Sequence, residues 1–450
     1  MIIVRSIGKS QDNKLSSKTL HILLFCSAVT LVAAYNRPDL PPGPYCGRPS
    51  NNQCCRDRKD DCSHRILDTL CYCDEFCNRT RTHDDCCPDY EEVCLGIQPD
   101  PGFLFQACTY RNKQYFPGDK RTDNCNTCEC VITDEQRKTT DWQCDSDVCL
   151  ISDDVVYGVN QPGMSWRASN YSQFYGKKLK EGLIYKLGTL PLSRETKRMG
   201  AIRYDKNIPY PQNFDARRRW PNYISPVVDQ GWCGSDWAVS IAGVASDRFA
   251  IQSNGAEALA LSPQTLLSCN IRQQQGCKGG HIDVAWNFAR GHGLVDERCF
   301  PYKAAVVRCP FKPKGNLIQD GCRPPITQRT SRYKVGPPGR LDKEKDIMYD
   351  IMESGPVQAV MTVYQDFFHY RDGIYRRSRH GDNRMSGLHS VRIVGWGEEG
   401  GDKYWIVANS WGTEWGENGF FRIARGINES DIESFVVTVL SDVTEANQKK

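Results

Sequence analysis

Cysteine content limits what this sequence can fold into more than any other feature. The chain carries 23 cysteines in 450 residues. Apart from the single Cys26, they form three even groups, of ten, six and six, within residues 46–94, 108–149 and 233–322. A reducing cytosol would keep so many thiols unpaired, so the sequence predicts a disulfide-bonded protein of an oxidising compartment. Because each larger group is even, each can close its disulfides within its own domain.

The overall composition excludes few functions. The formal charge is +4, from 58 Lys and Arg against 54 Asp and Glu, which gives no bulk argument for a nucleic-acid partner. Hydrophobic residues make up 39% and charged residues 25%, as in ordinary globular domains. At about 100–200 residues per domain, the length predicts two or three domains.

An apolar run, residues 20–34, follows Lys14 and Lys18 and ends in small residues. A membrane-spanning helix needs about 20 residues, so this run is short for one and suits signal peptidase instead. We predict a cleaved signal peptide over residues 1–34, with an uncleaved signal anchor as the alternative. Its removal would take away Cys26 and leave 22 cysteines, which is consistent with full pairing. We expect a secreted protein without a membrane span.

Three Asn-x-Ser/Thr sequons suit the same secretory route. They predict glycosylation at Asn78, Asn170 and Asn428.

Disulfides must stabilise the domain predicted over residues 45–95, because it has few large aliphatic residues. Its strings CYCDEFC and DCCPDYEEVC resemble those of the somatomedin-B module, a small disulfide knot of extracellular proteins.

The second group, residues 105–150, contains Cys-x-x-Cys-x-Cys from Cys125 to Cys130. This spacing could suit zinc, but an even count in a secreted chain favours disulfides. With Tyr115 and Trp142, the group resembles a von Willebrand factor C-type module.

The stretch after this module, residues 151–207, has no cysteine. Its apolar residues recur at steps of three and four, which predicts an amphipathic helix with Ser172 as a possible cap, through Leu179, Leu183, Ile184 and Leu187. Such a helix needs a surface to lie on.

Three motifs in residues 208–450 carry chemistry: DQGWCGSDWA from Asp229, SGLHSVRIVGWG from Ser386 and NSWGTEWG from Asn409. In this order they resemble the papain family of cysteine proteases, and FDARRRWP and NGFFRI resemble cathepsin B. The resemblance implies an α+β fold with a helical lobe and a β-barrel-like lobe, preceded by the small disulfide-rich modules. The string WRASNYSQF resembles a cathepsin B-type propeptide. We therefore expect residues 151–207 to form a propeptide-like segment that lies across the cleft.

Covalent amide cleavage needs a thiolate, an imidazole beside it, a group that holds the imidazole and donors for the oxyanion. By resemblance, His389 has the place of the base, Asn409 orients it and Gln230 donates to the oxyanion. The place of the nucleophile holds Asp236. A carboxylate attacks amides more weakly than a thiolate, opposes a neighbouring oxyanion and would pair with a protonated His389. We therefore expect all four positions to be vestigial and the chain not to be a peptidase.

Asp236 suits its position in other respects. In this fold the nucleophile opens a helix, where the dipole favours a carboxylate by about 0.3–1 kcal/mol. Cys233 cannot replace the nucleophile, because the resemblance implies a structural disulfide with Cys277. The His389–Asn409 pair can persist as core structure or contact a ligand. The cathepsin B occluding loop, expected within residues 299–322, carries two histidines in that enzyme and none here.

Two basic stretches, residues 217–219 and 376–384, could form one patch for heparan sulfate or an acidic protein. Charge runs are more often solvated loops.

The order of modules resembles the tubulointerstitial nephritis antigen family, whose members usually carry serine where Asp236 stands. The resemblance implies a matricellular glycoprotein that contacts laminin, collagen and cell-surface integrins, with secreted signalling ligands as further partners. We expect no cofactor, metal or nucleic acid. Three alternatives remain: an active hydrolase using Asp236 or a displaced cysteine, a carrier of a lipid-modified Wnt-type signal, and a decoy for protease inhibitors.

Overall fold

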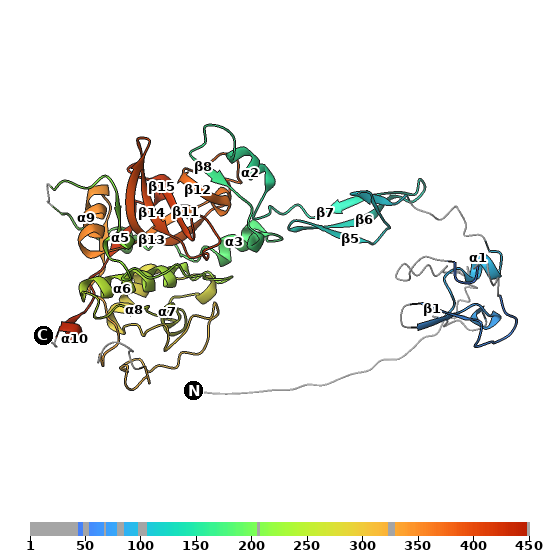
Figure 1. Cartoon of the computed structure of the whole chain (residues 1–450), viewed down its shortest axis with the longest axis horizontal. Coiled ribbons are helices and arrows are strands. Elements are labelled where there is room, and N and C mark those ends of the chain that lie inside the picture. The colour runs from blue at the N-terminus through green and yellow to red at the C-terminus, as the bar shows by residue number, and fades with distance from the viewer. Residues whose placement is uncertain are drawn as a thin grey trace, which may run out of the picture. The chain divides into compact units, whose positions relative to one another are not determined.

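The computed structural model describes residues 44–47, 54–66, 69–78, 85–97, 106–204, 208–322 and 329–447. The chain divides into two compact units, Met1–Leu104 and Phe105–Lys450, which are described one at a time (Figure 1). The predicted signal peptide and Cys26 lie outside the described residues. No helix of these ranges is long and apolar enough to cross a membrane.

The first unit is a small knot whose core consists largely of cysteines. It contains the hairpin of β1 (Ser63–Ile66) and β2 (Thr69–Tyr72), the 3-10 turn η1 (Glu75–Asn78) and helix α1 (Tyr90–Cys94). Four disulfides cross it, Cys46–Cys73, Cys54–Cys94, Cys55–Cys62 and Cys71–Cys87. Tyr45, Ile66 and Tyr90 complete the buried cluster. Each bridge adds roughly 2–4 kcal/mol, which replaces a larger apolar core.

Cys77 and Cys86 depart from the full pairing that an even group predicts. The structure leaves both unbonded, although their sulfur atoms lie within 4.8 Å of each other. The Cys77 thiol donates instead to the carbonyl of Tyr72, at 3.2 Å.

The second unit begins with a module of short strands. β3 (Cys108–Tyr110) pairs with β4 (Lys113–Tyr115), and β5 (Lys120–Asp123), β6 (Asn126–Asp134) and β7 (Thr139–Cys144) form an antiparallel sheet. Its six cysteines all pair, as Cys108–Cys130, Cys125–Cys149 and Cys128–Cys144. The spacing that could have suited zinc therefore forms disulfides.

A helical lobe and a sheet lobe make up the body of this unit, so the expected α+β architecture is confirmed (Figure 1). The helical lobe contains α6 (Asp236–Gln252), α7 (Pro263–Cys269) and α8 (Ile282–Gly291). Fifteen of the 17 residues of α6 are buried, which makes it the central helix of the lobe. Its buried charges Asp247 and Arg248 are paired with Arg392 and Asp350. α8 buries one face, formed by Ile282, Ala285, Trp286 and Ala289 at helical spacing.

The sheet lobe is built on nine strands in the order β10-β16-β11-β13-β14-β15-β12-β8, with β9 also paired to β13. The strands are β8 (Trp166–Ala168), β9 (Phe214–Asp215), β10 (Gly339–Leu341), β11 (Val357–Val363), β12 (Tyr370–Tyr375), β13 (Gly387–Glu399), β14 (Asp402–Ala408), β15 (Phe420–Ala424) and β16 (Val436–Thr438). The remaining helices are α2 (Asp153–Val159), α3 (Leu179–Tyr185), α4 (Arg194–Lys197), α5 (Ala216–Arg219), α9 (Glu344–Ser354) and α10 (Thr444–Asn447). Each lobe has its own apolar core.

The amphipathic helix predicted after residue 151 is present but begins later than expected. Ser172 opens a 3-10 turn, η2 (Ser172–Phe174), and α3 starts only at Leu179. Gly176 separates the two at φ 74°, a left-handed conformation that ends the first turn. The Glu181 side chain then accepts the Lys178 backbone N–H at 2.8 Å and caps α3.

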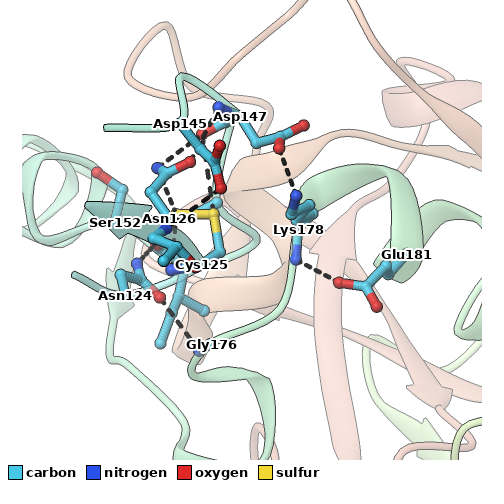
Figure 2. The surroundings of a disulfide bond; sticks show 12 residues. Asn124, Cys125, Asn126, Asp145, Asp147, Ser152, Gly176, Lys178 and Glu181 are labelled. Atoms are coloured by element: carbon cyan, nitrogen blue, oxygen red, sulfur yellow. Dashed lines mark hydrogen bonds and ion pairs between the residues drawn. A yellow bond between two sulfur atoms is a disulfide. The ribbon is translucent and has the colours of Figure 1, made fainter. Parts of the chain in front are cut away.

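The end of the strand module joins the start of α3 through paired backbone. Leu150 N–H donates to Lys177 O at 2.8 Å, and Leu179 N–H donates to Val148 O at 2.7 Å. Figure 2 shows the Asp147 carboxylate facing the Lys178 ammonium beside the Cys125–Cys149 disulfide. The module and the propeptide-like segment are thus held together by ion pairs, backbone bonds and a nearby disulfide.

Candidate functional site

The predicted site residues meet where α6 begins, between the two lobes. Asp236 is the first residue of α6, His389 lies on β13 and Asn409 follows β14. Asp236, His389 and Gln230 are fully buried, and Asn409 is 5% exposed. The disulfide Cys233–Cys277, the pairing that the papain resemblance implies, closes the loop just before α6.

Both oxygens of Asp236 accept hydrogen bonds from other segments. Oδ1 accepts the backbone N–H of Gly188 at 2.6 Å. Oδ2 accepts the Thr189 hydroxyl at 2.8 Å, the Ser390 N–H at 2.7 Å and His389 Nδ1 at 3.0 Å. Hydrogen bonds to a charged acceptor contribute about 1.5–3 kcal/mol each. This carboxylate is therefore held on every side rather than presented to a substrate.

His389 lies between two acceptors. Its Nδ1 faces Asp236, and its Nε2 lies 2.8 Å from Asn409 Oδ1. That amide oxygen also accepts the Ser410 N–H at 2.8 Å, which identifies it as the acceptor end of the amide. Each ring nitrogen therefore faces an oxygen of the protein itself. Trp411 packs beside this ring at 5.2 Å between centroids.

Part of the propeptide-like segment, residues 186–190, runs through the cleft and is here called the strap. Its Gly188 carbonyl accepts the Gly280 N–H at 2.8 Å, and its Leu190 N–H donates to Gly280 O at 3.0 Å. A Cβ at Gly188 would lie 1.9 Å from the carbonyl oxygen of Gly234. Only glycine lets the strap approach the start of α6 this closely.

The strap also accepts a hydrogen bond from Gln230, the donor that the resemblance assigns to an oxyanion. Gln230 Nε2 donates to Cys233 O at 2.9 Å and to Lys186 O at 3.3 Å. Trp411 Nε1 donates to the same Lys186 carbonyl at 3.2 Å. The chain's own backbone therefore occupies the place where a substrate carbonyl would bind.

The Lys186 side chain is buried against two rings and one carboxylate. Its Nζ lies 5.3 Å from the Trp232 ring centre, 5.6 Å from that of Phe174 and 3.8 Å from Asp229 Oδ1. Burial lowers the pKa of Lys186 to about 8, and Asp229 opposes this shift. Cation–π contact of this kind contributes about 0.5–2 kcal/mol and holds the strap at its start.

A cavity of about 260 Å³ remains beside the strap. Its lining is mixed, with Gln173, Val227, Asp229, Trp411, Gly412, Thr413 and Glu414. Among the described residues, two cysteine clusters of the first unit have metal-ligand spacing. Cys46, Cys73 and Cys87 are all in disulfides, so only Cys77, Asp85 and Cys86 offer free ligand atoms.

The other predicted positions lie apart from the cleft. Asn170 and Asn428 are exposed, and the Asn78 sequon extends outside the described residues. In the basic stretches, Arg217, Arg376 and Arg384 pair with Asp215, Asp402 and Asp382, which neutralises part of the charge. The occluding-loop region is closed by Cys269–Cys309 and Cys299–Cys322.

Sequence reasoning missed four residues of the site: Lys186, Gly188, Thr189 and Ser390. Ser390 was next to a predicted residue, and its position beside His389 on a strand was the available signal. Leu187 belonged to the predicted apolar pattern, but the other strap residues follow α3 without a periodic pattern. Their contacts with Asp236 span 47 and 48 positions, which local sequence does not reveal.

The fold and this cleft define a class of protein. Residues 210–440 match the family described as papain family cysteine protease. Among solved structures, proCathepsin B S9 from Trypanosoma congolense is 30% identical with a TM-score of 0.54, over 65% of this chain and 99% of that chain. The second unit therefore has the papain-like fold.

Relatives that align with most of this chain define a more specific family. The human protein "Tubulointerstitial nephritis antigen-like" is 42% identical over 423 residues, 88% of each chain. The bovine "Tubulointerstitial nephritis antigen" is 38% identical over 443 residues, 90% of this chain and 89% of its own. The chain belongs to the tubulointerstitial nephritis antigen family.

Proposed function

We propose that the chain is a secreted, noncatalytic peptidase homologue that acts as a binding protein of the extracellular matrix. The observation that carries this proposal is the environment of Asp236. A carboxylate stands in the place of the nucleophile, and four donors hold it inside a cleft that the strap already fills.

The geometry argues against the alternative of an active hydrolase. A general base must reach a proton of the substrate, but His389 is fully buried and its two nitrogens face Asp236 and Asn409. In the second unit every described cysteine is disulfide-bonded, so none of them offers a thiolate in place of Asp236. The Gln230 amide donates to the chain's own carbonyls.

Secretion is supported by the ten disulfides of the described residues and by the exposed sequons at Asn170 and Asn428. Because the strap fills the cleft, we place contacts with laminin, collagen, integrins or heparan sulfate on other surfaces. A lipid-modified Wnt-type ligand would need an apolar groove. The cavity beside the strap presents Asp229 and Glu414 instead, which disfavours the carrier alternative.

Peptide turnover tests the proposal. The intact secreted chain, its Asp236→Cys variant and an Asp236→Cys/Gly188→Ala variant are assayed on a fluorogenic dipeptide amide. We expect no turnover by the unmodified chain and iodoacetamide-sensitive turnover by the double variant, in which a thiol is restored and the strap displaced. Multiple turnovers by the unmodified chain would contradict the proposal.

Binding to matrix components is measured with the same proteins. Laminin- and collagen-coated surfaces should retain the unmodified chain and Asp236→Cys equally, because the binding surfaces lie outside the cleft. Retention that changes with residue 236 would place the contact in the cleft.

A further inference from the structure

One face of the helical lobe concentrates positive charge. Residues 298–319 contain five basic residues and no acidic one. All five side chains are exposed, Arg298, Lys303, Arg308, Lys312 and Lys314. None of them forms an ion pair within the described ranges.

A disulfide brings a second basic loop to this face. Cys269–Cys309 joins the end of α7 to the middle of the basic run. Arg272 follows Cys269 by three residues, and Lys312 follows Cys309 by three. Arg272 is exposed as well. The two loops therefore present their charges near the same disulfide.

A third segment adds to the same face. Leu294 and Tyr333 exchange backbone hydrogen bonds, so Gly293 lies between the side chains of Arg332 and Lys334. Arg332 donates to Lys312 O at 2.7 Å, which fixes the basic run beside this segment. The neighbouring imidazole, His292, is exposed at the end of α8.

Three positively charged side chains act on His292. Burial and then the charges of Arg332, Lys334 and Arg272 lower the pKa of His292. Asp320 neutralises Arg332 at 2.6 Å, and Asp442 lies beside Lys334, with its N–H donating to the Lys334 carbonyl. Arg272, Arg308, Lys312 and Lys314 have no such partner among the described residues.

We infer that this face, formed by Arg272, His292, Arg308, Lys312, Lys314 and Lys334, binds a sulfated glycosaminoglycan of the heparan sulfate type. The inference deepens the proposed extracellular function and rests on it. Spaced cations without carboxylate partners attract a chain that carries repeated sulfates, since binding releases the counterions condensed on that chain. The stretch 376–384, by contrast, pairs Arg376 and Arg384 with carboxylates.

Heparin affinity tests the inference on the full secreted chain. Dissociation constants for a heparin dodecasaccharide are measured across a salt series for the unmodified chain, Arg272→Gln/Lys334→Gln and Lys312→Gln/Lys314→Gln. The matched control is Arg218→Gln/Arg379→Gln, which removes two exposed arginines, one from each of the other basic stretches. We expect each test pair to raise the dissociation constant roughly tenfold. The slope of the logarithm of the dissociation constant against the logarithm of the salt concentration should fall by about 1–2. The control pair should change neither quantity.

Three results would overturn the inference. The first is absence of heparin binding by the unmodified chain near physiological salt. The second is an equal loss in the control pair, which would place the site on the other stretches. The third is equal binding of desulfated heparin or polyglutamate, which would indicate an acidic-protein surface. The variants replace exposed side chains and the half-buried Lys334, and unchanged melting temperatures confirm that they fold. Peptide turnover is scored separately, so a failure here is distinguishable from a failure of the noncatalytic proposal.

Discussion

At the scale of single residues, Asp236 gives the place of the nucleophile a structural role within an unchanged fold. Its position was predictable, because DQGWCGSDWA places it at the start of a helix. We expected its oxygens to serve the first turn of that helix. They accept instead from the strap and from β13, because Asp236 is the first helical residue and Ser235 is the cap. The side chain therefore points out of α6 into the cleft.

Gly188 gives the sharpest steric test of the strap. A methyl group there would lie 1.9 Å from Gly234 O, so Gly188→Ala must displace the strap. We expect the free energy of unfolding to fall by about 1–3 kcal/mol, as it does when a packed site is overfilled. Trypsin should also cleave faster at Lys186, which is buried in the unmodified chain. Gly200→Ala is the control, because a Cβ there meets nothing within 4 Å. Equal cleavage rates in the two variants would show that the strap does not need this close approach.

Cys77 and Cys86 carry a second prediction at this scale. Their sulfur atoms lie within 4.8 Å, and an oxidising compartment favours closure of such a pair. We predict a fifth disulfide in the knot of the secreted protein. Alkylation under denaturing, nonreducing conditions should add nothing to the unmodified chain and one group to Cys77→Ser. Two added groups on the unmodified chain would refute this pairing.

At the scale of elements, periodicity located α3 but not its start. The apolar spacing was correct for Leu179, Leu183 and Ile184, but α3 ends at Tyr185, before Leu187. The cap at Ser172 was wrong because Gly176 turns the backbone between Ser172 and α3. The path of the strap after α3 was expected only as a segment across the cleft. Its register on Gly280 depends on backbone bonds, which side-chain patterns do not encode.

His369 connects the propeptide-like segment to the sheet lobe and makes this connection pH-dependent. Its Nε2 accepts the Ser152 N–H at 2.9 Å, which requires a neutral ring. Burial lowers the pKa of His369 to about 4, below its ordinary value. The unfolded chain therefore binds more protons than the folded chain between pH 6.5 and 4, so stability falls as the pH falls through this range.

Urea unfolding at several pH values measures this effect. Between pH 6.5 and 4, the contribution of His369 to the slope of the unfolding free energy against pH should approach about 1.4 kcal/mol per pH unit. Above this range the contribution should vanish. His369→Gln should flatten the profile, whereas the control His281→Gln should not. An unchanged slope in His369→Gln would exclude this histidine as the cause.

At the scale of the whole molecule, motifs predicted the architecture better than the connections. Three short strings implied a two-lobed α+β body, and cysteine grouping implied small modules before it. Neither indicated that the strand module would join α3 through Val148, Leu150 and the Asp147–Lys178 ion pair. Such contacts depend on three-dimensional packing of segments that share no motif. The result is a cleft closed by a segment that is itself fastened to a disulfide-bonded module.

The central claim is that Asp236 turns the reactive position into an attachment point for the strap. Hydrogen exchange of the strap amides in the intact secreted protein tests it most directly. In the unmodified chain, Gly188 and Leu190 should be as protected as the interior of α6. Asp236→Ala should accelerate the exchange of both amides by about 100-fold, which corresponds to a loss of about 3 kcal/mol in the free energy of opening the strap. The control Asp372→Ala, which removes a carboxylate from an exposed ion pair with Arg371, should leave the exchange unchanged. Rapid exchange of the strap in the unmodified chain, or unchanged protection in Asp236→Ala, would contradict the account.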